Sequence, residues 1–243
     1  TSRGVSGNMG QSDIIEVFTI YGQESSTSSE LCRSLVQFPV DTIATDRTNG
    51  DIPASGSVSF YLRLFNAEQS QTTPRNFILS VNAVSLSWAE GLGLDMEEYS
   101  DIGASNWITA SSSPIVKWAT EGGDYYTDAS SSFSQSFDTG LEDMELDISS
   151  LVEQWISASN GSVASTDDLG SKTNFGVGIQ LTASQEDETT SYYTKKFFAR
   201  GSQYYFKRPI LEARWDSSKQ DDRNNMYLSS SMVPASDNLM KLY

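Results

Sequence analysis

The stretch LEDMELDISSLVEQWISASN, residues 141–160, predicts a β-strand that runs directly into a helix. In its first half, apolar residues alternate with acidic ones, which is typical of a strand with one face on a core and the other in water. The predicted strand covers residues 141–148. Its inward residues are Met144, Leu146 and Ile148, and its outward residues are Asp143, Glu145 and Asp147.

The second half of the stretch predicts a short amphipathic helix. Ser150 and Glu153 have the spacing of a capping box, in which a hydroxyl and a carboxylate each accept a hydrogen bond from a backbone amide at the helix start. Asn160-Gly161 supplies a stop signal. A helix of about ten residues is not stable alone in water, so we expect it to pack on a mouth or edge of a β-sandwich. Its apolar face consists of Leu151, Val152, Trp155 and Ile156.

Alternation of apolar residues recurs along the chain. It is clearest at 57–64, and it returns at 175–181, where Gly176 and Gly178 are expected to face outward. The segment 77–88 changes phase at Ala83-Val84, which we interpret as a β-bulge that keeps the later apolar residues on the same face. Further strands are expected over residues 13–21, 31–38, 192–199 and 209–215, and loops over 39–53 and 91–136.

Together these segments predict an all-β fold. Short strands separated by turn signals indicate an antiparallel jelly-roll sandwich of about eight or nine strands with one short helix. The expected organisation is an N-terminal arm (1–11), a jelly-roll domain (12–215) and an extended C-terminal tail (216–243) that would also suit a linker to a further domain.

Charge and composition limit the functional classes. The net charge is −16 and the pI is about 4.2, so the chain repels nucleic-acid phosphates and anionic lipids, and we expect neither nucleic acid nor membrane as a partner. The chain contains no histidine, which removes the commonest general base and most zinc sites. Cys32 is the single cysteine, and we expect a small buried hydrophobic residue there.

Three phrases in the second half resemble a known family. They are DISSLVEQW at 147–155, NFGVGI at 174–179 and RPILEA at 208–213. In this order they are similar to the DNRLRE-type jelly-roll domains of secreted proteins, cell-wall proteins and phage virions. Four further phrases resemble structural proteins of marine tailed phages, cyanophages in particular: GLDMEEY at 93–99, EGGDY at 121–125, SYYTKKFF at 191–198 and EARWDSS at 212–218.

The resemblance implies a non-enzymatic virion component without catalytic residues or cofactors. Such a protein is assembled in the host cytoplasm and contacts other copies of itself and other virion proteins. It would occupy the head, neck, tail or fibre of the particle. In agreement, no Gly-x-Ser-x-Gly motif is present and no motif selects a catalytic carboxylate pair among the acidic residues.

Basic residues concentrate in the segment 192–214, where they alternate with aromatic ones. The pattern superficially resembles a platform for single-stranded nucleic acid, but the net charge opposes that interpretation. Ordinary strand surface and contact with an acidic protein neighbour, such as the 95–101 segment of the next copy, are the interpretations that remain. These acidic residues match no EF-hand spacing, so no metal site is predicted. The candidate interface residues are Lys195, Lys196, Arg200, Lys207, Arg208, Asp95, Glu97 and Glu98.

Aromatic residues in the long loop suggest an alternative function. Exposed rings stack on sugar faces in many carbohydrate-binding sandwiches, so the alternative is a carbohydrate-binding module or adhesin for a host-surface glycan. Burial of the same rings under the loop or at an interface is the competing interpretation. The candidate glycan-binding residues are Trp107, Trp118, Tyr125 and Tyr126.

Overall fold

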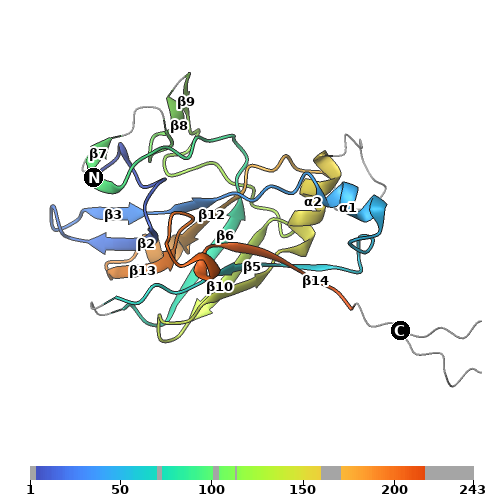
Figure 1. The fold of residues 1–243 in the computed structure, drawn as a ribbon. Coiled ribbons are helices and arrows are strands. Elements are labelled where there is room, and N and C mark those ends of the chain that lie inside the picture. The colour runs from blue at the N-terminus through green and yellow to red at the C-terminus, as the bar shows by residue number, and fades with distance from the viewer. Residues whose placement is uncertain (1–3, 70–72, 101–103, 113, 160–170, 217–243) are drawn as a thin grey trace, which may run out of the picture.

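The structure is a computed structural model that describes residues 4–69, 73–112, 114–159 and 171–216, except 101–103. Two antiparallel sheets face one another across the main core (Figure 1). One has the strand order β10-β6-β12-β4, with β10 Ser132–Phe137, β6 Phe77–Ala83, β12 Val177–Leu181 and β4 Ser34–Val36. The other has the order β11-β5-β14, with β11 Met144–Asp147, β5 Ser59–Leu64 and β14 Ile210–Arg214. The predicted all-β sandwich is therefore confirmed.

Strand β5 shows why the periodicity was informative. Phe60, Leu62 and Leu64 are almost completely buried, and the residues between them are not. Leu62 is paired with Leu146 of β11 on one side and with Leu211 of β14 on the other. The alternate residues of β5 therefore place three apolar rows over the facing sheet, where β6 contributes Phe77, Leu79, Val81 and Ala83.

A third antiparallel sheet extends the sandwich at one end, with the order β13-β2-β3 (Figure 1). Its strands are β13 Tyr192–Phe198, β2 Ile14–Tyr21 and β3 Ser29–Cys32. The sequence predicted a single strand over 31–38, but Arg33 interrupts it. Before Arg33 the chain pairs with β2, and after it β4 pairs with β12, so the segment crosses from one sheet to another.

Helix α2 (Ser149–Ser159) closes the opposite end of the core. Its predicted apolar face is buried in the main cluster. The predicted capping box is wrong: the Ser150 hydroxyl donates to the Ser130 carbonyl, and Glu153 pairs with Arg47. Asp147 instead accepts the backbone N–H of Ser149 and so serves the helix start. The predicted stop at Asn160-Gly161 lies outside the described residues.

The expectation of one helix is also wrong, because the described part of the chain contains three further short helical segments. Helix α1 (Ile43–Asn49) lies in the predicted loop 39–53 and ends at Gly50, whose φ of 82° is in the left-handed region. No residue of α1 is fully buried, so it lacks the apolar stripe by which a helix is recognised. The others are α3 (Ala183–Glu186) and the 3₁₀ helix η1 (Tyr205–Lys207).

The phase change after Ala83 marks a second core and not a bulge within one face. Val84 is buried with Ala110 and Trp118, apart from the main cluster. The long segment predicted as loop supplies short strands: β8 (Thr109–Ser112) pairs with β9 (Ile115–Lys117), and β7 (Asp95–Ser100) pairs with β1 (Gly7–Asn8) of the N-terminal segment. These pairs raise the strand number above the expected eight or nine.

The predicted N-terminal arm is tied to the chain's own loops over its described part. Asn8 is buried, and its amide donates to the carbonyls of Glu90 and Ser105. The predicted C-terminal tail lies outside the described residues apart from Asp216.

Candidate functional site

A groove of about 1620 Å³ runs along the sheet β13-β2-β3. Alternate residues of a strand share a face, and Glu16, Phe18 and Ile20 of β2 line the groove together with Glu30 and Cys32 of β3. Residues of the N-terminal segment, of the long loop and of η1 also line it. The sheet therefore gives the groove a mixed lining of apolar and acidic side chains.

Arg33 organises one end of this groove. Its Nε and Nη2 donate to the two carboxylate oxygens of Glu186, and its Nη1 donates to the Gly122 carbonyl. The guanidinium also lies over the Trp107 ring, 5.0 Å from the centroid. Because the pair with Glu186 is largely buried, with side-chain exposures of 17% and 8%, it holds the guanidinium in the position where it contacts Gly122 and Trp107.

Three of the four predicted glycan-binding residues come together at this end. Trp107, Trp118 and Tyr125 line the groove. Trp118 is only 7% exposed and donates its Nε1–H to the Asn106 carbonyl, so it is mainly part of the second core. Tyr125 donates its hydroxyl to the Gly122 carbonyl, and burial raises its pKa to about 12.

Tyr126 is separate from the other three aromatic residues. It packs against the main core, and the Lys172 ammonium lies 5.1 Å from the centroid of its ring. The sequence placed Tyr125 and Tyr126 in one group of four candidate residues, but neighbouring residues in extended backbone point to opposite sides.

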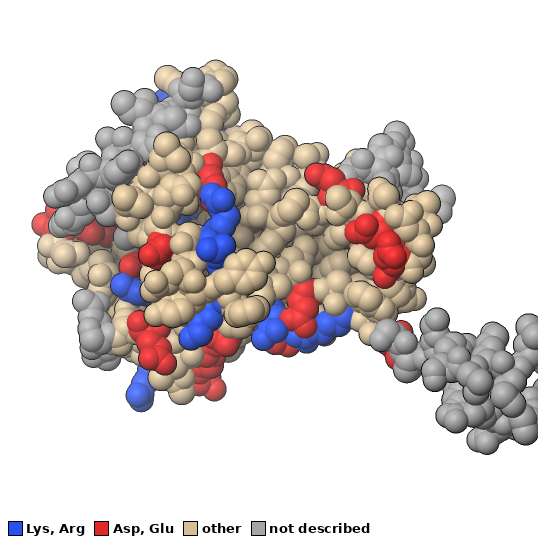
Figure 2. Space-filling view, in the orientation of Figure 1, with Lys and Arg blue, Asp and Glu red and all other residues tan. Residues whose placement is uncertain are grey.

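The predicted basic interface residues are used largely inside the fold. Lys195 is 1% exposed and donates to three oxygens, so it is not part of an exposed basic surface. Lys196 pairs with Glu16, and Arg200 pairs with Glu90. On the face of the molecule that Figure 2 shows, basic and acidic side chains of the described residues lie next to one another. Lys207 lies over the Phe198 ring, and Arg208 donates to the Ser202 carbonyl and lies over Tyr205.

The predicted acidic partners of these residues lie on β7. The structure describes the backbone of this strand, whereas the side chains of Asp95, Glu97 and Glu98 lie outside what it describes. Among the described residues, no group of three or more potential metal ligands is found. None of the described helices has the length and apolar character of a membrane-spanning segment.

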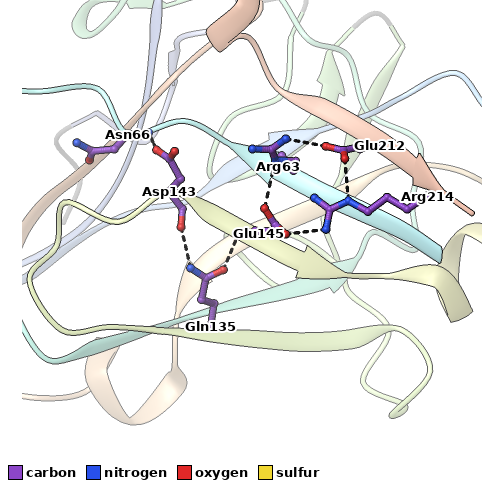
Figure 3. Close-up of polar contacts among 7 residues, drawn as sticks. All are labelled: Arg63, Asn66, Gln135, Asp143, Glu145, Glu212 and Arg214. Atoms are coloured by element: carbon purple, nitrogen blue, oxygen red, sulfur yellow. Dashed lines mark hydrogen bonds and ion pairs between the residues drawn. The ribbon is translucent and has the colours of Figure 1, made fainter.

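A second cluster of charges occupies the outer face of the sheet β11-β5-β14 (Figure 3). Arg63 pairs with Glu145 and Glu212, and Arg214 pairs with the same two carboxylates, so the four side chains form a closed ring. Hydrogen bonds from Arg214 and Arg63 lower the pKa of Glu212 to about 2. All four groups are at least 31% exposed, so solvent screens the ring, and we assign it a structural role on the sheet surface.

An exposed aromatic group lies at the other side of the groove. Tyr204, Tyr205 and Phe206 are 55%, 70% and 86% exposed, and Tyr205 and Phe206 line the groove. We name Tyr204–Phe206 the aromatic knob. From the sequence, these residues were interpreted only as the aromatic part of the basic segment 192–214. Their signal was three consecutive aromatic residues before Arg208-Pro209, where no alternation can bury them all.

Fold and site together define an acidic β-sandwich with an open groove bordered by aromatic residues. Comparisons with family models, curated proteins and solved structures give no match for this chain.

Proposed function

We propose that this chain is a non-enzymatic structural protein of a phage particle, built on a jelly-roll type of sandwich and acting through contacts with copies of itself and with other virion proteins. The assignment to a phage particle is supported by the resemblance of its sequence phrases to jelly-roll domains and to structural proteins of marine phages. The aromatic knob carries the proposal of a contact function, because consecutive exposed aromatic residues are unusual on a surface that only faces water.

Burial of the aromatic knob would also supply the free energy that such a contact needs. Complete burial of one large apolar side chain contributes about 1.5–3 kcal/mol. Copies of a chain with net charge −16 repel one another, and the cations described above are committed to internal partners. A contact between copies therefore depends on apolar area, and the knob together with the groove beside it offers that area.

The test is the assembly state of the full chain. Sedimentation velocity and electron microscopy are carried out over a range of protein concentration and salt. We expect ordered oligomers that become stronger with salt, because salt screens the repulsion between acidic copies. The double variant Tyr205→Ser/Phe206→Ser should weaken association at least about tenfold. Ile115→Ser is the matched control, because Ile115 is 72% exposed but does not line the groove. A chain that stays monomeric under all these conditions would refute the proposal.

A carbohydrate-binding function is the second candidate, and the position of Trp107 favours it. This ring lines the groove together with Tyr125. Aromatic rings that line a groove suit the apolar face of a host-surface glycan. Binding on a glycan array that is lost in Trp107→Ala and kept in Tyr126→Ala would establish this function. An array without binding excludes it for the glycans presented.

A further inference from the structure

Lys195 is a buried lysine that contacts no carboxylate group in an ion pair among the described residues. Its Nζ donates to Oδ1 of Asn66 at 2.7 Å, to the Gly140 carbonyl at 2.9 Å and to the Glu142 carbonyl at 2.8 Å. The Phe137 and Phe197 rings lie 5.0 and 4.7 Å from it. The amine is thus held at one position, with two aromatic rings keeping water away.

Asn66 presents its side-chain amide to this amine. It follows strand β5 and forms a single antiparallel bridge with Phe197 of β13. Its own backbone N–H donates to Oδ1 of Asp143, which fixes the residue from the other side. A carbonyl bond is about 1.23 Å long, so Cγ of Asn66 lies within about 3.9 Å of Nζ. Reacting atoms in a near-attack arrangement are about 3–3.5 Å apart.

We propose that Lys195 and Asn66 form an intramolecular isopeptide bond. The nitrogen lone pair of the neutral Lys195 amine attacks Cγ of Asn66, a new C–N bond forms, and the bond from Cγ to Nδ2 breaks. Nδ2 leaves as ammonia and takes the proton that Nζ loses. The products are one secondary amide and one ammonia, and no oxidant, reductant or co-reactant is needed.

The surroundings favour the reactive form of the amine. Burial lowers the pKa of Lys195 to about 8, against the opposing effect of the Glu142 and Asp143 charges. A substantial fraction of the amine is therefore neutral at mildly alkaline pH. Oε2 of Glu142 is buried and has no hydrogen-bond partner among the described residues. It offers a free acceptor, on a residue in contact with the amine, for carrying the proton from Nζ to the leaving nitrogen. Asn66 is only half-buried, so ammonia has a route to solvent.

The bond would join residues 129 positions apart in the chain. It would fasten β13 of the third sheet to the end of β5 in the sandwich, where backbone hydrogen bonds from Ala67 to Lys196 and from Phe198 to Phe65 already join the two segments. A covalent link over so long a loop restricts the unfolded chain, as a disulfide does.

Mass spectrometry of the purified full chain tests the proposal. After incubation at pH 8.5, the intact mass should be lower than the sequence mass by one ammonia. Trypsin should release peptide 64–75 joined to peptide 173–196, because trypsin does not cut after an acylated Lys195. The linked form of the chain should appear faster as the pH rises from 6 to 9. Lys195→Arg and Asn66→Ala should both keep the sequence mass, and Lys196→Arg, at the adjacent position, should still lose ammonia.

Succinimide formation at Asn49-Gly50 or Asn160-Gly161 also releases ammonia, so the joined peptide and not the intact mass alone decides. A wild-type chain that yields peptide 64–75 in linear form only, after prolonged incubation at pH 8.5, overturns the proposal. This result needs no variant to fold.

Discussion

Helix α2 is predicted to be held by Arg47 of helix α1 and not by a capping box. Arg47 donates to both carboxylate oxygens of Glu153, with Nη1 2.8 Å from Oε2. Both side chains are largely buried, with exposures of 14% and 12%. We consider the variants Arg47→Met, Glu153→Leu and the double variant, together with Ser150→Ala.

The structure sets the expected magnitudes. Two unit charges about 4 Å apart attract by about 4 kcal/mol at an effective dielectric constant of 20, but desolvation offsets much of this gain. Removing one partner leaves the other charge buried and costs about 3 kcal/mol or more. The double variant leaves no buried charge at this position. It should therefore cost less than the two single variants together, with a coupling energy of about 2 kcal/mol.

Guanidinium denaturation followed by far-UV circular dichroism measures these free energies of unfolding. Ser150→Ala should cost about 1 kcal/mol for its hydrogen bond to the Ser130 carbonyl, with no coupling to Glu153→Leu. Arg63→Met is the control for an exposed pair and should cost less than about 1 kcal/mol. A coupling of Arg47 with Glu153 below about 0.5 kcal/mol, or a strong coupling of Ser150 with Glu153, would refute this reasoning.

Three further predictions concern the groove and the charged ring. Burial, and to a smaller extent the Glu16 charge, raises the pKa of the Cys32 thiol to about 12. A thiol reagent at pH 8 should therefore modify the folded chain roughly 1000-fold more slowly than the unfolded chain. Equal rates of modification would contradict this. A Cβ at Gly178 would lie 2.2 Å from the Tyr125 ring, so Gly178→Ala should cost about 1–3 kcal/mol in thermal unfolding, and it should cost much less in a Tyr125→Ala background. The pKa of Glu212 is lowered to about 2, so its stabilising effect is complete above its ordinary pKa of about 4.3 and is lost as the pH falls towards 2. Glu212→Gln should flatten the loss of stability over that range, and an unchanged slope would argue against the ring.

Much of the sandwich could be predicted because burial alternates along its strands. In β5 every second residue enters the core, so the hydropathy pattern reports the fold directly. The buried face of α2 was visible for the same reason, with a period of 3.6 residues in place of two. Local patterns of this kind need no knowledge of the partner strand.

Other features depend on residues far apart in the chain, and the sequence alone could not predict them. Ser150 and Glu153 have capping-box spacing, but their partners are Ser130 and Arg47, which only the folded chain brings near. Gly178 was predicted to face outward, and the structure shows Tyr125 covering that face. The groove is likewise formed by segments from distant parts of the sequence.

The basic segment shows how strand geometry changes the meaning of a charge cluster. Lys195 and Lys196 are neighbours, so in strand β13 they point to opposite faces. Lys195 enters the interior towards Asn66, whereas Lys196 lies opposite Glu16 of β2 and pairs with it. Lys195 is thus removed from the surface and the charge of Lys196 is neutralised by Glu16, so the segment offers less positive charge to a partner than the sequence cluster suggests. Contacts between acidic copies then favour uncharged groups, and for this reason we place the proposed contact at the aromatic knob and not at the lysines.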